Sequence, residues 1–188
     1  MFGVFISLIV MCLAEERLVY KNGIFSNGYQ LKASTGYTST TAEYNNNIVI
    51  YIMLSQNGYA NFKTSAPIDM TKFKYLSFIV SWEQDGCNLG LAVSVGDGQK
   101  VDVTGSMGVN KLNRIYVDVS QSTFNTTSST FRIYKTDKTD SNIYFNDVKF
   151  TSEKGNEGVY SLSTDMDNND GSVICVIVAL ALLVLGLF

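Results

Sequence analysis

The stretch Lys74-Tyr-Leu-Ser-Phe-Ile-Val-Ser-Trp82 decides the fold of this chain. Large apolar side chains stand at every second position, including Leu76, Phe78 and Val80, and the small polar Ser77 lies between them. An alternation with a period of two is typical of a β-strand that buries one face and exposes the other. This segment therefore predicts a strand of a sheet that packs on a hydrophobic core.

The same alternation recurs on both sides of that stretch. Strands are predicted over residues 18–20, 29–33, 48–54, 59–64, 74–82, 88–95, 100–104, 114–119, 130–135 and 142–151. Short turn signals separate them, namely Asn22-Gly23, Asn27-Gly28, Asn57-Gly58, Asp85-Gly86 and Asp97-Gly98. Many short strands with such spacing predict an all-β fold, a two-sheet antiparallel β-sandwich.

The last predicted strand changes phase. Ile143 and Phe145 point to one face, but the next apolar pair, Val148 and Phe150, follows after one extra residue. One additional residue in a strand reverses the side to which later side chains point. A β-bulge is therefore expected near Asn146-Asp147.

Three segments carry a family resemblance. They are the closing stretch Asn142-Ile-Tyr-Phe-Asn-Asp-Val-Lys-Phe150, the opening Val19-Tyr20 with Gly23 and Asn27-Gly28-Tyr29, and Ile68-Asp69-Met70-Thr71 before the strand at 74–78. Together they resemble galactose-binding-like jelly-roll domains, a fold that many carbohydrate-binding modules share. The resemblance spans roughly residues 18–152 and implies a jelly roll. It also implies a structural calcium ion near the first and last strands, with Asp147 at the ligand position. No other cofactor is expected. Related modules often carry tryptophans where this chain has Tyr29 and Leu31.

The two ends of the chain have the patterns of targeting segments. Residues 1–14 are almost wholly apolar and predict a cleavable signal peptide before an ectodomain over residues 15–154. An acidic, polar stalk is expected over residues 155–172, followed by an apolar run at 173–188 that no Lys or Arg follows. Small residues, a polar spacer and an apolar tail form the pattern of a GPI-anchor signal, with Ser163 as the attachment residue. A short transmembrane helix is the alternative.

Composition excludes several classes of function. The chain has no histidine and a net charge of −3, so Ser-His-Asp and Cys-His catalysis, typical zinc sites and nucleic-acid partners are not expected. Cys87 is the only cysteine between the two apolar ends, which leaves it no intramolecular disulfide partner. Glu83 and Asp85 could form a glycosidase carboxylate pair, but acids beside a Gly are more often turn residues. The protein is therefore predicted not to be an enzyme.

Two functions remain open. The first is non-catalytic binding of glycans or cell-wall polysaccharide at the extracellular face of the plasma membrane. The second is a structural coat protein without a small ligand.

Candidate binding residues come from the strand faces that point away from the core. Tyr116, Asp118, Arg132 and Tyr134 are expected to form one surface, beside the small residues Gly90, Ala92 and Ser94. A second candidate is a loop cluster around Tyr29, Tyr37 and Tyr44. Asn125-Thr126-Thr127 is a glycosylation sequon that is expected in an exposed loop.

Overall fold

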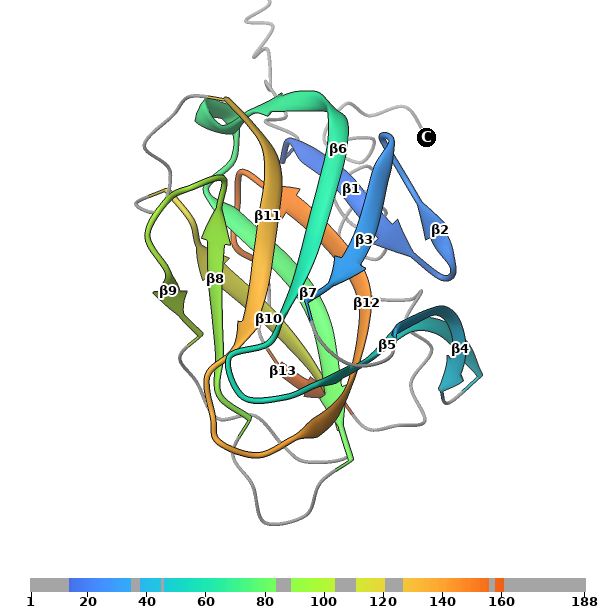
Figure 1. Ribbon diagram of the computed structural model, residues 1–188. Coiled ribbons are helices and arrows are strands. Elements are labelled where there is room, and N and C mark those ends of the chain that lie inside the picture. Colours follow the sequence, from blue (N-terminus) through green and yellow to red (C-terminus); the bar gives the residue numbers. More distant parts are fainter. Residues whose placement is uncertain are drawn as a thin grey trace, which may run out of the picture.

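The computed structural model describes residues 14–34, 38–44, 46–83, 89–103, 111–120, 127–155 and 158–160. These residues form a sandwich of two antiparallel sheets, so the predicted all-β jelly-roll fold is confirmed (Figure 1). Most of the predicted signal peptide and all of the predicted apolar tail lie outside the described residues. The same holds for Tyr37, Asp85, Cys87, Asn125 and Ser163.

One sheet has eight strands. Its path runs β13-β10-β7-β12-β1-β2, while β5 pairs with β12 and β4 pairs with β5. The strands are β1 (Glu16–Lys21), β2 (Ile24–Phe25), β4 (Thr38–Tyr44), β5 (Asn47–Leu54), β7 (Tyr75–Trp82), β10 (Leu112–Asp118), β12 (Ser141–Thr151) and β13 (Gly158–Tyr160).

The second sheet has five strands in the order β3-β6-β11-β8-β9 and lies in front in Figure 1. The strands are β3 (Tyr29–Ala33), β6 (Tyr59–Asp69), β8 (Leu91–Val95), β9 (Val101–Asp102) and β11 (Thr127–Lys135). A single 3-10 turn, η1 (Met70–Lys72), connects β6 to β7. Asp69 begins this turn, and its side chain accepts a hydrogen bond from the Thr71 N–H.

The apolar rows that the alternation predicts all lie in the core between the sheets. They include Leu76, Phe78, Val80 and Trp82 of β7, Leu91, Val93 and Val95 of β8, Ile115 and Val117 of β10, and Phe131 and Ile133 of β11. Phe131 of the five-stranded sheet meets Phe150 of the eight-stranded sheet edge to face, with ring centroids 5.2 Å apart. Aromatic contacts of this kind hold the two layers together.

The tight turns use asparagine in the left-handed region. Asn22, Asn27 and Asn57 have φ angles of 46°, 55° and 63°, and the Gly23 that follows Asn22 has φ 87°. Asparagine tolerates this conformation better than other side-chain-bearing residues do. The predicted turns at these positions are therefore confirmed.

The expected bulge in β12 is present. The register with β7 shifts between Asn146 and Lys149, and Asp147 has φ 43°. The bulge divides the other edge of β12, because residues 141–145 pair with β5 and residues 148–151 pair with β1. We call this divided edge the fork in β12. The Asn146 side chain connects it to the β1–β2 turn, because it accepts a hydrogen bond from the Asn22 N–H at 3.0 Å and donates one to Asn22 Oδ1 at 2.8 Å.

Three of the described strands, β2, β4 and β13, lie outside the strands expected from the sequence. β4 was not predicted, because its sequence lacks apolar alternation and it forms through pairing with β5. Residues 158–160, within the stretch expected to be a stalk, pair with β10 as β13. A segment of three residues is too short for an alternating pattern to predict a strand, and β13 forms by pairing with the free edge of β10. Within the described ranges, no helix is long and apolar enough to span a membrane.

Candidate functional site

The four residues predicted to share one surface lie on different sheets. Tyr116 and Asp118 belong to β10 of the eight-stranded sheet, whereas Arg132 and Tyr134 belong to β11 of the five-stranded sheet. The prediction of a single surface is therefore wrong. Alternation identifies the side of a strand that points away from the core, but a sandwich has two such sides, on opposite surfaces.

The outer face of the five-stranded sheet carries three rows of side chains that cross the strands. The register gives the rows Gln30, Lys63 and Thr130, then Lys32, Asn61, Arg132 and Ser94, then Tyr59, Tyr134, Ala92 and Asp102. As expected, the small residues Ala92 and Ser94 lie directly beside Tyr134 and Arg132. Tyrosines, amides and basic side chains are thus brought together from strands that are distant in the sequence.

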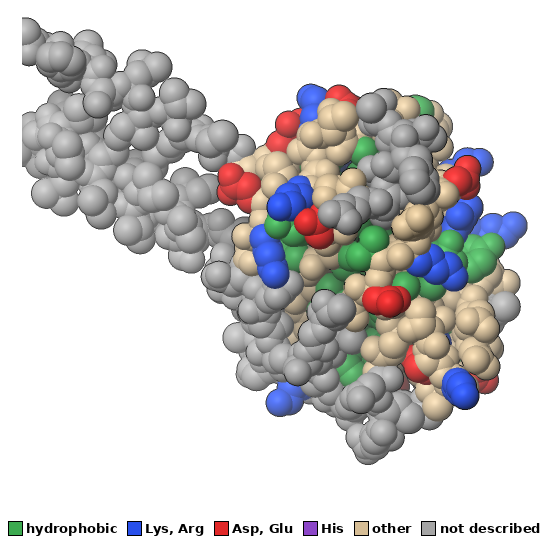
Figure 2. Space-filling model, turned by 90° about the vertical axis from the view of Figure 1, so that its left-hand side faces the viewer, with side chains coloured by type: hydrophobic (Ala, Val, Ile, Leu, Met, Phe, Trp, Pro, Cys, Tyr) green, Lys and Arg blue, Asp and Glu red, His purple; other side chains and the backbone are tan. Residues whose placement is uncertain are grey.

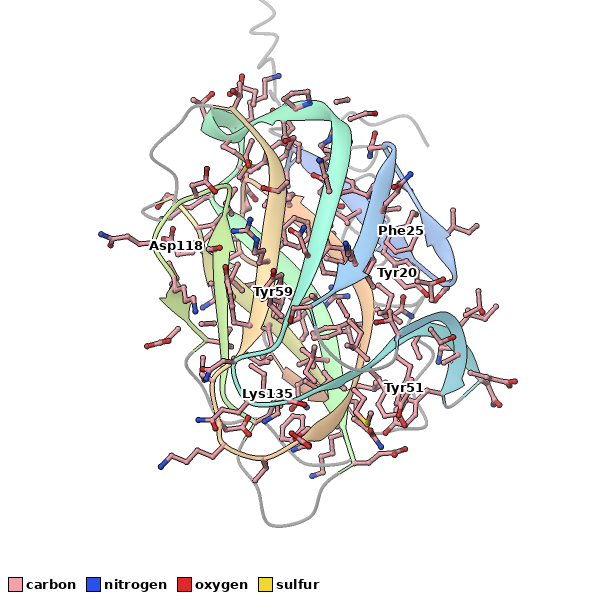
Figure 3. The ribbon with its side chains drawn as sticks, in the orientation of Figure 1. Tyr20, Phe25, Tyr51, Tyr59, Asp118 and Lys135 are labelled. Atoms are coloured by element: carbon pink, nitrogen blue, oxygen red, sulfur yellow. The ribbon has the colours of Figure 1, made fainter. Side chains whose placement is uncertain are left out.

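Two tyrosines form an aromatic pair on this face. The Tyr59 and Tyr134 rings are directly opposite across β6 and β11, with centroids 5.5 Å apart and an interplanar angle of 54°. Figure 3 shows Tyr59 near the middle of the front sheet. The Tyr134 hydroxyl lies 3.3 Å from Ser94 Oγ, and Lys100 Nζ lies 3.9 Å from the centre of the Tyr134 ring. Both tyrosines are half-buried, so their rings are fixed in place while part of each stays exposed.

Polar groups adjoin the tyrosine pair. The Arg132 guanidinium carbon is 5.8 Å from the Tyr59 ring centre, and its Nη1 donates to the Gly96 carbonyl at 3.5 Å. Asn61 Oδ1 is buried and accepts no hydrogen bond from any described residue. A buried acceptor without a donor costs about 1–3 kcal/mol, which a ligand hydroxyl can offset once a neighbouring side chain moves aside to expose the oxygen. Sequence reasoning did not select Tyr59 or Asn61, although both stand at the outward positions of the predicted strand 59–64.

Tyr116 and Asp118 line a pocket of about 370 Å³ where β10 of the eight-stranded sheet approaches β9, the edge strand of the five-stranded sheet. The remaining lining residues are Tyr75, Val101, Asp102, Val103, Val117 and Lys154. The Tyr75 and Tyr116 rings are perpendicular, with centroids 6.4 Å apart. Burial raises the pKa of Asp118, but hydrogen bonds from Ser120 and the charge of Lys74 outweigh it and hold the pKa below its usual range. Asp118 is therefore an ionised acceptor whose Oδ1 already accepts from the Ser120 N–H at 3.0 Å.

The predicted loop cluster of tyrosines does not form as expected. Tyr29 is buried in the core, edge to face with Phe131 at 6.0 Å. Tyr44 lies in a strand, stacked on Tyr144 with centroids 4.2 Å apart, and its hydroxyl is 3.0 Å from Ser81 Oγ. Tyr37 is outside the described residues. Contacts within the sheet thus occupy Tyr44.

The surroundings of Asp147 do not fit a calcium ion. The Asp147 carboxylate forms an ion pair with Arg114, and the Arg114 Nη1 also donates to the Asp147 carbonyl at 3.2 Å. A guanidinium beside the carboxylate already supplies the positive charge that a calcium ion would supply. In the part of the chain that the structure describes, no three acidic or cysteine side chains gather as a metal site would require.

Glu83 lies near the tyrosine stack. Burial raises the pKa of Tyr144, and the neighbouring Glu83 raises it further. Glu83 and Asp140 line a pocket of about 300 Å³ together with Met53, Ser141 and Asn142. Because Asp85 is outside the described residues, the carboxylate pair considered from the sequence is untested.

Comparison with known proteins supports the fold. No protein-family model matches this sequence, and no curated protein matches it either. Solved structures of family 29 carbohydrate-binding modules are similar in three dimensions. One variant of such a module has a TM-score of 0.56 at 14% identity, with 84% of this chain and 100% of that chain covered.

Two further solved structures contain ligands. A variant of a family 29 module in complex with mannohexaose has a TM-score of 0.55 at 15% identity, covering 74% of this chain and 93% of that one. A variant in complex with cellulohexaose has a TM-score of 0.54 at 16% identity, covering 82% and 97%. The domain described here therefore has the jelly-roll fold of carbohydrate-binding modules.

Proposed function

We propose that this protein binds glycans, without catalysis, through the outer face of the five-stranded sheet. The observation that carries the proposal is the Tyr59–Tyr134 pair beside Asn61, whose side-chain oxygen is buried and lacks a donor among the described residues. The fold similarity to modules that were solved with mannohexaose and cellulohexaose supports the same class of ligand.

The chemistry of this face suits a pyranose ring. Tyrosine rings offer apolar contact area to the carbon–hydrogen face of a sugar, while amide and guanidinium groups bond its hydroxyls. The Lys100 ammonium covers part of the Tyr134 ring and would have to move when a sugar stacks there. That displacement is inexpensive, because Lys100 is exposed and an exposed cation–π contact contributes only about 0.5–1 kcal/mol.

Replacement of the tyrosine pair is expected to weaken binding. In protein purified from cells that express the full chain, Tyr59→Ala with Tyr134→Ala should lower the affinity for mannohexaose or cellohexaose by about tenfold or more. The reason is the loss of the stacking surface. Isothermal titration calorimetry measures the effect, with circular dichroism to confirm that each variant is folded.

The matched variant is Tyr75→Ala with Tyr116→Ala, which removes two tyrosines of the eight-stranded sheet from the other pocket. It should leave the affinity within about twofold. If this pair, rather than Tyr59 and Tyr134, abolishes binding, the glycan site is the 370 Å³ pocket. If no oligosaccharide binds the unaltered protein, the coat-protein alternative is favoured.

We also propose that a GPI anchor at Ser163 tethers the domain to the outer face of the plasma membrane. The support is the sequence pattern alone: a signal-peptide-like start, small residues near 163, a polar spacer and the apolar run at 173–188. Phosphatidylinositol-specific phospholipase C should release the protein from intact cells. Mass spectrometry that finds residues 173–188 in the membrane-bound protein would instead indicate a transmembrane helix.

A further inference from the structure

Three basic side chains on the outer face of the five-stranded sheet have no acidic partner in the described part of the chain. Lys32, Lys63 and Arg132 project from β3, β6 and β11, and none of them forms an ion pair with any residue that the structure describes. In Figure 2, basic and hydrophobic side chains lie together along the right-hand side of the domain, the side that bears this sheet, with an acidic side chain among them near the top.

Several basic residues of the eight-stranded sheet and of the segment leading into it do form ion pairs. The pairs are Arg114 with Asp147, Lys149 with Glu16 at 2.9 Å, and Lys74 with Asp118 at 3.8 Å. Both surfaces belong to one chain with a net charge of −3, so general basicity does not explain the unpaired cations. Arg17, Lys111 and Lys138 also form no ion pair with any described residue, but only on the surface that carries the tyrosine pair do three such cations project from adjacent strands.

The unpaired cations surround the candidate site. Lys32 and Arg132 stand on either side of Asn61 in one row, so their backbones are two strand spacings apart, about 10 Å. Lys63 is two residues further along β6, on the same face. Positive charges thus lie on both sides of Asn61, which is in the row next to that of Tyr59.

Acidic residues are scarce in these strands. Asp69 is at the far end of β6, where its carboxylate accepts from the Thr71 N–H at 3.0 Å and the Thr71 hydroxyl at 2.6 Å. Asp102 is on the edge strand β9, beyond Ala92 in its row. Neither carboxylate is placed to neutralise Lys32, Lys63 or Arg132.

We propose that the glycan bound here is acidic and carries carboxylate or sulfate groups. This inference rests on the proposed function, since it names the charge of the ligand for the same face. A guanidinium bonds carboxylate and sulfate through parallel N–H donors, and lysines attract either group as point charges. The tyrosine pair holds the ring of the sugar while the three cations select its anionic substituents.

The test compares ligands of equal length and different charge. Protein purified from cells that express the full chain is titrated with mannohexaose and cellohexaose, a galacturonic acid hexasaccharide, a heparin hexasaccharide and inorganic polyphosphate. At least one acidic hexasaccharide should bind about tenfold or more tightly than the neutral ones. That preference should shrink as the salt concentration is raised from about 0.05 M to about 0.5 M, because the Debye screening length then shortens from over about 10 Å to under about 5 Å.

Variants separate the roles of charge and stacking. Lys32→Gln with Lys63→Gln should lower the affinity for the acidic hexasaccharide about tenfold and change neutral binding less than about twofold. Lys72→Gln with Lys74→Gln changes the net charge equally outside this face and should have no such effect. Tyr59→Ala with Tyr134→Ala should weaken acidic and neutral binding alike.

Three results would overturn the inference in distinguishable ways. Neutral hexasaccharides that bind as tightly as acidic ones would refute the acidic ligand and leave glycan binding standing. Polyphosphate that binds as tightly as the acidic sugars, unaffected by loss of the tyrosines, would reveal unspecific attraction of anions. Failure of every sugar to bind would refute the proposed function itself.

Discussion

Arg114→Met is expected to lower the free energy of unfolding by about 3–5 kcal/mol, the usual effect of removing one partner from a buried ion pair. The Arg114 side chain is 10% exposed and that of Asp147 is 7% exposed. Without Arg114, the Asp147 carboxylate would be a buried charge that neither water nor a cation stabilises. Urea denaturation of the purified protein measures the loss.

The position of the pair explains the size of this effect. Arg114 extends from β10 past Ser77 of β7 to the bulge of β12, so one side chain links three neighbouring strands. Lys72→Met is the control, because its partner Glu15 and Lys72 itself are both about half exposed and the change should cost less than about 1 kcal/mol. Equal losses in the two variants would show that the buried pair has no special role.

Asp137→Asn is expected to destabilise the domain by about 3 kcal/mol, the lower end of the range for a broken buried pair. Lys135 stands at a core-facing position at the end of β11 with its side chain 0% exposed, and Asp137, 18% exposed, is its acidic partner. Figure 3 shows Lys135 at one end of the sandwich. The variant leaves a buried ammonium group without a counter-charge.

The same pair predicts a dependence on pH. Burial raises the pKa of Asp137, but hydrogen bonds from Lys135, Thr139 and Gly90 outweigh it and lower the pKa in the folded protein. The stabilisation is therefore present above the unfolded-state pKa of about 3.9 and is lost as the pH falls through the lower, folded-state value. Asp69 and Asp118 have lowered pKa values too. The free energy of unfolding is therefore measured for Asp137→Asn and for the unaltered protein from about pH 6 down to about pH 2, and the difference between the two curves gives the contribution of Asp137.

Lys135→Met combined with Asp137→Asn provides the control. A buried ion pair replaced by an apolar side chain of similar size is often neutral, so the double variant should regain most of the stability. If Asp137→Asn alone costs less than about 1 kcal/mol, or the double variant is as unstable as the single one, the buried pair is not the cause.

Sequence patterns predicted the core far better than the surface. Every apolar row named from alternation is buried, and the extra residue before Val148 correctly indicated the bulge in β12. These features are local, because parity along one strand decides them. Sheet membership is not local, and so Tyr116 and Arg132, both correctly assigned to outward faces, were wrongly joined into one site.

The candidate site was missed for the same reason. Tyr59, Asn61 and Lys32 become neighbours of Arg132 only through the strand order β3-β6-β11, which no short motif encodes. Lys135 is a second case, since a lysine at a core-facing position looks exposed until the loop that supplies Asp137 is placed. A charge count along strands 29–33, 59–64 and 130–135 would have shown that these segments hold basic residues and no acid.

The fork in β12 also governs when this protein can fold. β12 joins β7 to both β1 and β5, yet it is among the last parts of the domain to be synthesised. Its end meets the start of the first strand of the domain through Glu15 and Ser152, which are 137 residues apart in sequence. Until β12 emerges, the earlier strands of the eight-stranded sheet have open edges and an uncovered apolar face, the state in which β-proteins aggregate most readily. The eight-stranded sheet can therefore close only after nearly the whole domain has been synthesised.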